Sequence, residues 1–211
     1  MLAASAHVVP SWQPPIDRST TFLGSFVASS ISGADRCWVG ACVVEDRRTV
    51  TSVVTSGAPA APYRPGYLAL REGPLLEAAV RQVTAPFDIL LVNATGRDHP
   101  RAAGLALHLG AVLDVPTVGV TDRPLVAEAE GEPGAERGSS AALLHGGEVV
   151  GALLRTRRHA RPVVVHPGWR TDVITATAVV LSAAGGGRTP EPIRRARQLA
   201  RIARAGADGR R

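Results

Sequence analysis

The middle of the chain alternates between short apolar runs and a segment with helical spacing. Residues 88–92 form a short, largely apolar run, residues 102–113 have helical spacing, and residues 115–120 form a second apolar run. A strand, a helix and a strand in this order make the two strands parallel neighbours, and parallel sheets are covered by helices on both faces. This alternation predicts an α/β fold.

Further strands and helices are predicted on both sides of this unit. A polar turn at 45–47 joins two strand-like segments into a hairpin, and Gly146-Gly147 joins a second pair. Apolar residues at helical spacing predict the remaining helices. The predicted strands are 32–44, 48–56, 141–144, 148–156 and 163–165, and the predicted helices are 71–83, 172–184 and 190–205.

The length of 211 residues and the hydrophobic content of 45% suit one domain with tails. Residues 1–30 show no sustained period and are expected to be poorly ordered, with the domain at 31–184. From Gly185 onward the chain has 8 arginines and 2 acids, which accounts for the whole net charge of +6. Residues 185–211 are therefore expected to form a basic helix or tail, whose arginines could contact phosphates. Since the chain has no lysine, mechanisms that need one are excluded.

The sequence has no run of about 20 apolar residues and no signal-peptide pattern at its start. A soluble, cytoplasmic protein without a membrane partner is expected. Cys37 and Cys42 are five residues apart in one predicted strand, so they point to opposite faces and cannot pair with each other. The oligomeric state stays open, with a monomer as the expectation.

Three collinear blocks carry a resemblance to a known family. They are PYRPGYLALREGP at 62–74, DILLVNATGRDHPRAAGLALHLG at 88–110 followed by DVPTVGV, and GGEVVGALLRTR at 146–157 followed by RPVVVHPGWR and PEPIRRA. Together they resemble the endonuclease V family, whose members recognise inosine and cut a phosphodiester nearby. The resemblance implies a ribonuclease H-like mixed central sheet flanked by helices.

The resemblance also implies acidic residues at strand ends that hold Mg²⁺ or Mn²⁺ beside the scissile phosphate. The family's first-strand aspartate is matched to Asp35, a metal ligand and catalytic residue, and its glutamate is matched to Glu72. Taken without the family, Asp35 would be a turn or strand-edge residue. Glu72 would be a helix N-terminal carboxylate favoured by the dipole.

Three positions depart from the family pattern. Asn93 stands where the next metal ligand should be an aspartate, so metal binding there is expected to be weakened. Asp122 replaces a lysine, and Trp169 replaces a histidine that could transfer a proton. His166, three residues before Trp169, and Asp98 are candidates to stand in for the lost groups, and Asp98 is more simply a solvated loop acid.

The residues that the resemblance assigns to the substrate are better preserved. In the family, the segment Pro62–Pro65 acts as a wedge at the damaged base, where Tyr63 can stack and the prolines stiffen the loop. The alternative without a role in function is that Pro62–Pro65 forms a surface turn with a half-buried tyrosine. A tight pocket for the flipped base is implied around these residues: Tyr63, Pro65, Gly66, Ala94, His99, Gly104 and Gly119. Ala94 replaces a pocket glycine, and His99 could instead be a structural histidine.

Three functional hypotheses follow. The first is a protein that binds inosine-containing or otherwise damaged DNA or RNA, with metal-dependent cleavage impaired or lost. The second is an active Mg²⁺-dependent endonuclease V in nucleic-acid repair, using Asp35, Glu72 and Asn93. The third is a protein-interaction module that has lost nucleic acid. Whether the protein is an enzyme, and whether it needs a cofactor, depends on which hypothesis holds.

Overall fold

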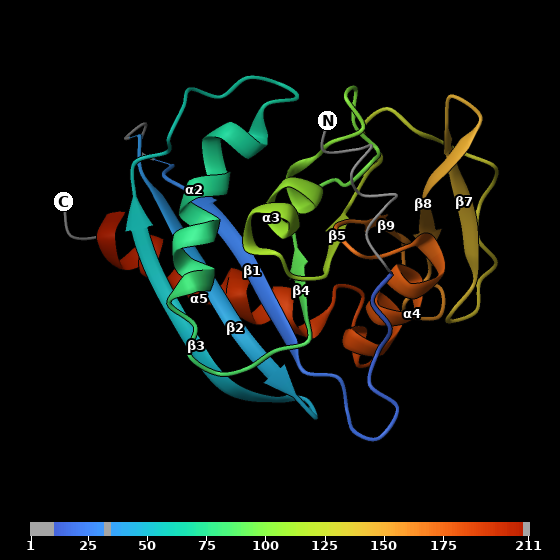
Figure 1. Cartoon of the computed structure of the whole chain (residues 1–211), viewed down its shortest axis with the longest axis horizontal. Helices are drawn as coiled ribbons and strands as arrows, with labels where there is room; N and C mark the ends of the chain where they lie inside the picture. The colour runs from blue at the N-terminus through green and yellow to red at the C-terminus, as the bar shows by residue number, and fades with distance from the viewer. Residues whose placement is uncertain (1–10, 32–34, 209–211) are drawn as a thin grey trace.

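One sheet runs through the middle of the molecule (Figure 1). The structure is a computed structural model that describes residues 11–31 and 35–208. Within these residues the sheet has nine strands in the order β3-β2-β1-β4-β5-β9-β8-β7-β6. The strands are β1 (Phe22–Ser29), β2 (Cys37–Glu45), β3 (Arg48–Gly57), β4 (Ile89–Val92), β5 (Thr117–Thr121), β6 (Glu128–Ala129), β7 (Ser140–His145), β8 (Glu148–Leu154) and β9 (Val163–Pro167).

The three central strands β1, β4 and β5 are parallel, and the other neighbouring pairs are antiparallel. The parallel pair predicted from the strand, helix and strand alternation is therefore confirmed. Both predicted hairpins are confirmed as β2–β3 and β7–β8. The predicted strand at 32–44 begins at Cys37 in the structure, and its residues 32–34 lie outside the described residues.

Helices cover both faces of the sheet. The helices are α2 (Leu68–Arg81), α3 (Leu105–Leu113), α4 (Val173–Ala184) and α5 (Glu191–Asp208). Leu90 and Val92 pack in the cluster that contains α2 and α3 residues, whereas Ile89 and Leu91 pack in the cluster of α4 and α5 residues. Alternate side chains of β4 thus point to opposite helical layers, which explains why the strand is apolar at every position.

The N-terminal boundary of the domain needs correction. Residues 1–30 were expected to be poorly ordered, but β1 pairs with both β2 and β4 in the middle of the sheet. Gly24 makes this possible, since a Cβ there would lie 2.1 Å from the carbonyl carbon of Pro192. The backbone of α5 therefore packs directly on β1. Residues 1–10 lie outside the described residues.

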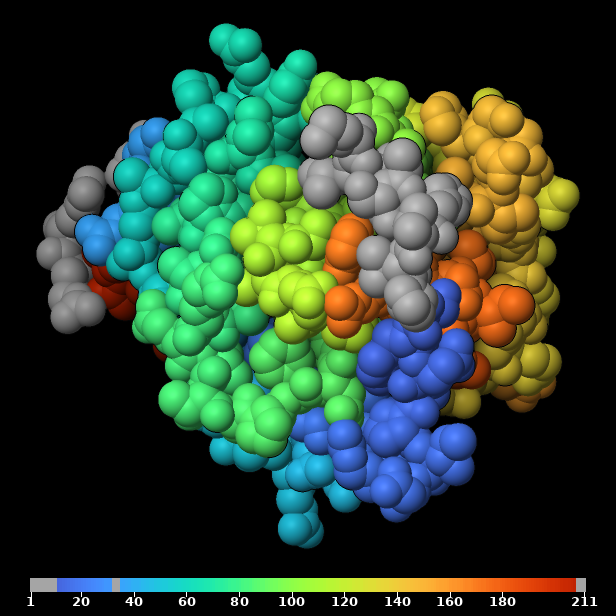
Figure 2. Space-filling model, viewed as in Figure 1, coloured from blue at the N-terminus to red at the C-terminus, as the bar shows by residue number. Residues whose placement is uncertain are grey.

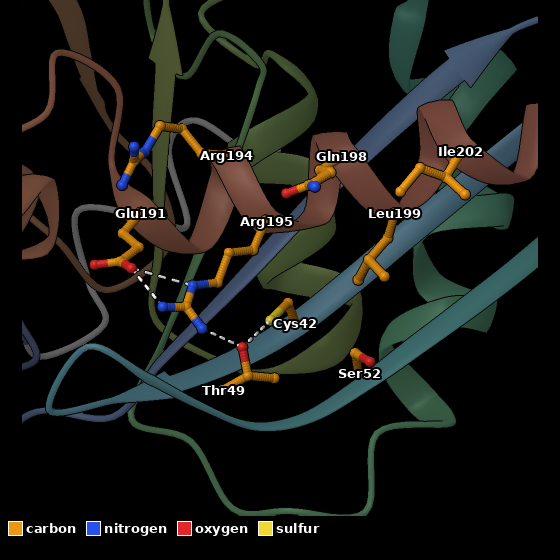
Figure 3. Close-up of a pocket in the computed structure, with 9 residues that line it drawn as sticks. All are labelled: Cys42, Thr49, Ser52, Glu191, Arg194, Arg195, Gln198, Leu199 and Ile202. Carbon is orange, nitrogen blue, oxygen red and sulfur yellow. Dashed lines mark hydrogen bonds and ion pairs between the residues drawn. The ribbon is translucent and has the colours of Figure 1, made fainter. Parts of the chain in front are cut away.

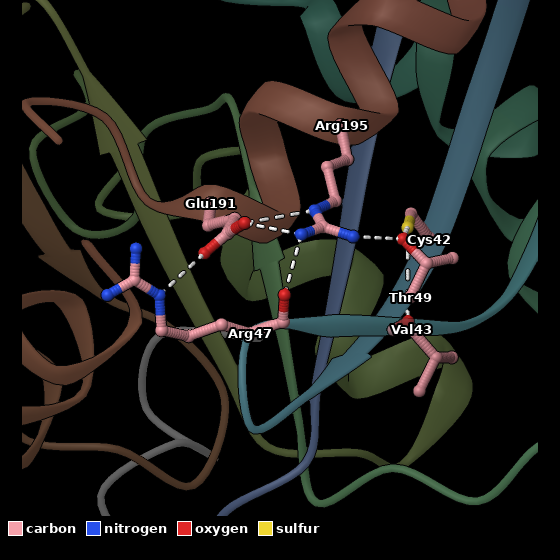
Figure 4. Close-up of polar contacts among 6 residues, drawn as sticks. All are labelled: Cys42, Val43, Arg47, Thr49, Glu191 and Arg195. Carbon is pink, nitrogen blue, oxygen red and sulfur yellow. Dashed lines mark hydrogen bonds and ion pairs between the residues drawn. The ribbon is translucent and has the colours of Figure 1, made fainter. Parts of the chain in front are cut away.

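The C-terminal helix also belongs to the domain. Helix α5 has the predicted amphipathic pattern, with Ile193, Ala196 and Ala200 fully buried against β1 and β2. Arg195 ties it to the β2–β3 hairpin by donating to the Arg47 carbonyl at 2.7 Å and to Thr49 (Figure 4). The same guanidinium donates to Glu191 of its own helix at 2.5 Å. The expected division at residues 184 and 185 therefore does not separate a free tail from the domain.

Cys37 and Cys42 both lie on β2 and are free thiols, as predicted. Among the described residues, no helix combines the length and the apolar character needed to cross a bilayer.

Candidate functional site

The carboxyl ends of β4 and β5 lie side by side, next to the middle of β1. Ser25 of β1 is in register with Val92 of β4, which is in turn in register with Gly119 of β5. Ligands of open α/β sheets bind beyond the carboxyl ends of the strands. The segment before α2 and the loop after β4 both lie at this end of the molecule (Figure 1).

A cavity of about 250 Å³ opens at this end, lined by the segment before α2, the loop after β4 and the end of β5. Four of the residues predicted to bind substrate line it: Tyr63, Gly66, Ala94 and His99. Asn93, the position of the altered metal ligand, lines it as well. The structure thus brings four predicted substrate-binding residues and one predicted metal position around a single cavity.

The loop that carries Tyr63 is held in shape by backbone contacts. Gly66 has a φ of +75°, a conformation that side chains disfavour. Its carbonyl contacts His99 Nε2 at 3.1 Å and accepts a hydrogen bond from Arg101. Tyr63 is 67% exposed, so its ring is free to stack on a ligand. Figure 2 shows this segment and the loop after β4 side by side on the surface.

Tyr67 is a residue that sequence reasoning missed. Its ring lies under the guanidinium of Arg101, 4.1 Å from the ring centroid, a cation–π contact that joins the two loops. The sequence did contain a signal, because the chain has only two tyrosines and both stand in this segment.

Three predicted pocket residues do not line the cavity. Gly104 and Gly119 lie behind it, where a Cβ would fall 2.3 Å from the Thr95 carbonyl oxygen and 2.2 Å from that of Ala94. These glycines let the loop after β4 pack closely on α3 and β5, so they shape the pocket indirectly. Pro65 also lies outside the lining and restricts the backbone of the loop.

The matching of Asp35 to the first strand needs correction. Strand β1 ends at Ser29, and the Ser30 amide donates to the Arg36 carbonyl, which places Asp35 in the connection to β2. The Asp35 side chain is 70% exposed and pairs with Arg71 at 3.2 Å. On β1 itself, the residue beside Val92 is Ser25, which is fully buried with an unpartnered Oγ. The first strand therefore carries no carboxylate.

Glu72 is the carboxylate that faces inward in this region. It lies one helical turn after Leu68 and Ala69, which line the cavity. It also lies one turn before Leu76, which packs in the hydrophobic cluster of α2 and α3 residues. Burial raises the pKa of Glu72 from 4.5 to about 7, and the charge of Arg71 opposes this only in part. The side chain is therefore protonated in a large fraction of molecules near neutral pH.

These residues do not suit Mg²⁺ or Mn²⁺. Such ions need several hard, preferably anionic, oxygen ligands. Ser25 and Asn93 are neutral and Asp35 is paired with Arg71, so Glu72 is the one remaining carboxylate among them. Among residues 11–31 and 35–208, no group of three or more His, Cys, Asp or Glu side chains is arranged to hold a metal ion.

Asp122 and Trp169 lie apart from these residues. Asp122 follows β5 and forms an ion pair of 2.6 Å with Arg188, which lowers the pKa of the Asp122 carboxyl. Trp169 lies beside the opposite end of β5, where its amide donates to Thr117 and its indole donates to Asp114. The structure therefore does not bring Trp169 to the cavity.

Asp98 and His166 are fully buried, which corrects the expectation that Asp98 is a solvated loop acid. The Asp98 carboxylate accepts hydrogen bonds of 2.8 Å from the amides of Leu125, Val126 and Ala127. Burial lowers the pKa of His166, so its imidazole is neutral at physiological pH. These residues hold the loop after β5 and have no direct access to a phosphate.

A larger cleft, of about 520 Å³, lies between α5 and the β2–β3 hairpin (Figure 3). It is on the other face of the sheet from α2 and α3. None of the predicted site residues lines this cleft, and its Arg195 is already held by Glu191 and Thr49. The smaller cavity at the strand ends is therefore the better candidate.

Comparison with known proteins identifies the family of the chain. The family model described as Endonuclease V matches residues 14–198, most of the chain. The chain belongs to the endonuclease V family. A curated endonuclease V from Methanopyrus kandleri is 43% identical over 188 residues, which cover 85% of this chain and 81% of the relative.

Solved endonuclease V structures share the fold. The enzyme from Streptomyces avermitilis has a TM-score of 0.87 and 34% identity, covering 98% of this chain and 93% of its own. Endonuclease V from Ciona intestinalis, in complex with a 24-mer DNA containing an inosine followed by a ribo-adenosine, has a TM-score of 0.82 and 19% identity. That match covers 98% of this chain and 95% of the Ciona chain. The mixed sheet flanked by helices that was expected for an endonuclease V relative is confirmed.

Proposed function

We propose that this endonuclease V-family protein binds inosine-containing or otherwise damaged nucleic acid and that its metal-dependent phosphodiester cleavage is impaired or lost. The observation that carries the proposal is the pair of neutral residues, Ser25 and Asn93, where the central strands should supply carboxylates.

The binding part of the proposal is supported by the cavity and the loop beside it. The exposed ring of Tyr63 can stack on a base, which is worth roughly 1 to 3 kcal/mol. A flipped base would enter the 250 Å³ cavity next to it. The Ciona relative was solved with inosine-containing DNA, which makes the same ligand class reasonable here. Arginines of α5 can add contacts to phosphates that are independent of sequence.

The loss of cleavage is supported by electrostatics. At about 4 Å and an effective dielectric of about 20, one unit charge interacts with another by about 4 kcal/mol, and a dication doubles this figure before desolvation is subtracted. Replacing one carboxylate by an amide and a second by a hydroxyl removes this attraction twice. If only a quarter of it is realised, binding of Mg²⁺ falls by more than tenfold at each position.

A nicking assay tests the cleavage part. Purified protein is incubated with inosine-containing and matched control DNA and RNA, in Mg²⁺ and separately in Mn²⁺. We expect no nicking above that of a Glu72→Gln control. Robust nicking of the inosine strand that disappears in Glu72→Gln would refute the loss of cleavage and establish an active endonuclease V.

Binding measurements across salt concentrations test the other part. We expect tighter binding to inosine-containing oligonucleotides than to controls, and an affinity that falls linearly in log–log form as salt rises. Equal binding to both oligonucleotides would refute inosine recognition. Absence of affinity for any nucleic acid would favour a protein-interaction module instead.

An active endonuclease is the second candidate function, and family membership together with Glu72 favours it. The Asn93 side chain still has an oxygen that could contact a metal ion, and Glu72 lies one turn from the cavity. On this hypothesis the protein nicks inosine-containing strands and depends on Glu72.

A further inference from the structure

Three polar side chains lie close together where β5, β9 and the loop after β4 pack against one another. They are Thr121 of β5, His166 of β9 and Asp98 of the loop. Asp98 and His166 are fully buried, and Thr121 lines the cavity at the strand ends. Thr121 Oγ1 lies 2.8 Å from His166 Nε2 and 2.8 Å from the Arg123 carbonyl oxygen. Thr121 thus connects a buried polar network to the wall of the proposed base pocket.

The hydrogens of this network can be assigned by counting donors. A hydroxyl has one hydrogen, and the Arg123 carbonyl can only accept, so the Thr121 hydrogen goes to that carbonyl. The contact between Thr121 and His166 then needs its hydrogen from His166 Nε2. In this arrangement Thr121 donates to the backbone and accepts from the imidazole.

The other ring nitrogen is consistent with this assignment. A neutral imidazole has one N–H, so a hydrogen on Nε2 leaves Nδ1 without one. His166 Nδ1 is buried and has no hydrogen-bond partner, and its nearest acidic oxygen, Asp98 Oδ2, is 3.9 Å away. The Asp98 carboxylate already accepts hydrogen bonds from three backbone amides. A hydrogen on Nδ1 would therefore be buried without an acceptor in range, which is costly.

We propose that Thr121 is a specificity-determining residue of the base pocket, whose Oγ1 is held by His166 as a hydrogen-bond acceptor for an N–H of the bound base. A hydroxyl oxygen has two lone pairs, and His166 uses one of them. The free lone pair selects bases with a ring N–H, as in 6-oxopurines such as hypoxanthine, over purines whose ring nitrogen has only a lone pair. This inference rests on the proposed function, since it concerns the same cavity.

The binding test compares wild type and Thr121→Val with three oligonucleotides that differ at one base: hypoxanthine, unsubstituted purine and adenine. Unsubstituted purine lacks the N–H without adding bulk. In wild type we expect tighter binding of hypoxanthine than of purine, and in Thr121→Val this ratio should fall by roughly five- to tenfold. Thr121→Ser keeps the hydroxyl and should keep the ratio.

Thr117→Val is the matched control, because Thr117 lies at the opposite end of β5 and donates to the Ala106 carbonyl. It should leave the ratio unchanged. If wild type prefers hypoxanthine over adenine but Thr121→Val keeps the full ratio of hypoxanthine to purine, the role of Thr121 is refuted while the proposed function stands. If wild type does not distinguish hypoxanthine from adenine, the proposed function fails, and this inference fails with it.

A second measurement applies even if Thr121→Val does not fold. The ¹⁵N shifts of the His166 imidazole in the wild-type protein report which nitrogen is protonated. We expect a neutral ring protonated at Nε2. A hydrogen at Nδ1 would mean that Thr121 donates to His166 and would overturn the proposal.

Discussion

Glu72 provides a prediction whose magnitude follows from its surroundings. Burial raises the pKa of the folded-state carboxyl from 4.5 to about 7. A group whose pKa is raised on folding favours the folded state at low pH, and this contribution is lost as pH rises through the folded pKa. Each unit of difference between the folded and unfolded pKa corresponds to about 1.4 kcal/mol. Ionised Glu72 therefore lowers the free energy of unfolding by up to about 3 kcal/mol above pH 7.

The substitution Glu72→Gln removes the titration and keeps the shape. Below about pH 4 the variant and the wild type should have similar free energies of unfolding, since Glu72 is protonated in both folded and unfolded wild type. Between pH 4.5 and 7 the variant should become progressively more stable than wild type, by up to about 3 kcal/mol at pH 8.

Urea unfolding at a series of pH values, with a chelator present, measures this difference. Glu77→Gln is the matched control on the same helix, because Glu77 is partly exposed and pairs with Arg81 at 2.8 Å. Its effect should stay within about 0.5 kcal/mol. A Glu72→Gln variant that is less stable than wild type at pH 8, or whose difference from wild type does not change with pH, would refute the reasoning.

Three further predictions concern recognition and packing. Tyr63→Ala should weaken binding of inosine-containing DNA by roughly 1 to 3 kcal/mol in a fluorescence titration, and unchanged affinity would refute the stacking role. The melting temperature should not change, because Tyr63 is 67% exposed. Asp98→Ala should destabilise the protein by at least about 2 kcal/mol in urea unfolding, since three backbone amides lose their acceptor; a loss below about 0.5 kcal/mol would contradict the buried network. Gly24→Ala should lower the free energy of unfolding by about 1 to 3 kcal/mol, because the added Cβ would lie 2.1 Å from the backbone of Pro192. An unchanged free energy of unfolding would show that α5 does not pack on β1 as described.

The layout of the sheet could be predicted where each segment carries its own pattern. The β4, α3 and β5 unit follows from apolar runs at strand and helix spacing, and the β2–β3 hairpin follows from the polar turn at 45–47. Strand β1 could not be predicted in this way. Gly24 and Ser25 interrupt its apolar pattern, and the reason for Gly24 is a contact with Pro192, which lies far away in the sequence.

The candidate site was predictable to a similar degree. The sequence could predict which residues line the cavity when they lie in continuous segments whose order matches the family. This holds for Tyr63, Gly66, Ala94 and His99. Asp35 was matched to the wrong place because the first strand had not been found, and the next aspartate along the chain took its position. The burial of Asp98 depends on the fold of residues 125–127, which no local pattern indicates.

We propose that neutral side chains at Ser25 and Asn93 leave Mg²⁺ without the ligands needed for cleavage. Isothermal titration of Mg²⁺ and Mn²⁺ into wild type and the Ser25→Asp, Asn93→Asp double variant, with nicking of inosine-containing DNA measured in parallel, tests it most directly. We predict weak metal binding without nicking in wild type, and at least tenfold tighter binding with a gain of nicking in the double variant. Tight metal binding together with strand cleavage by the wild-type protein would contradict the claim.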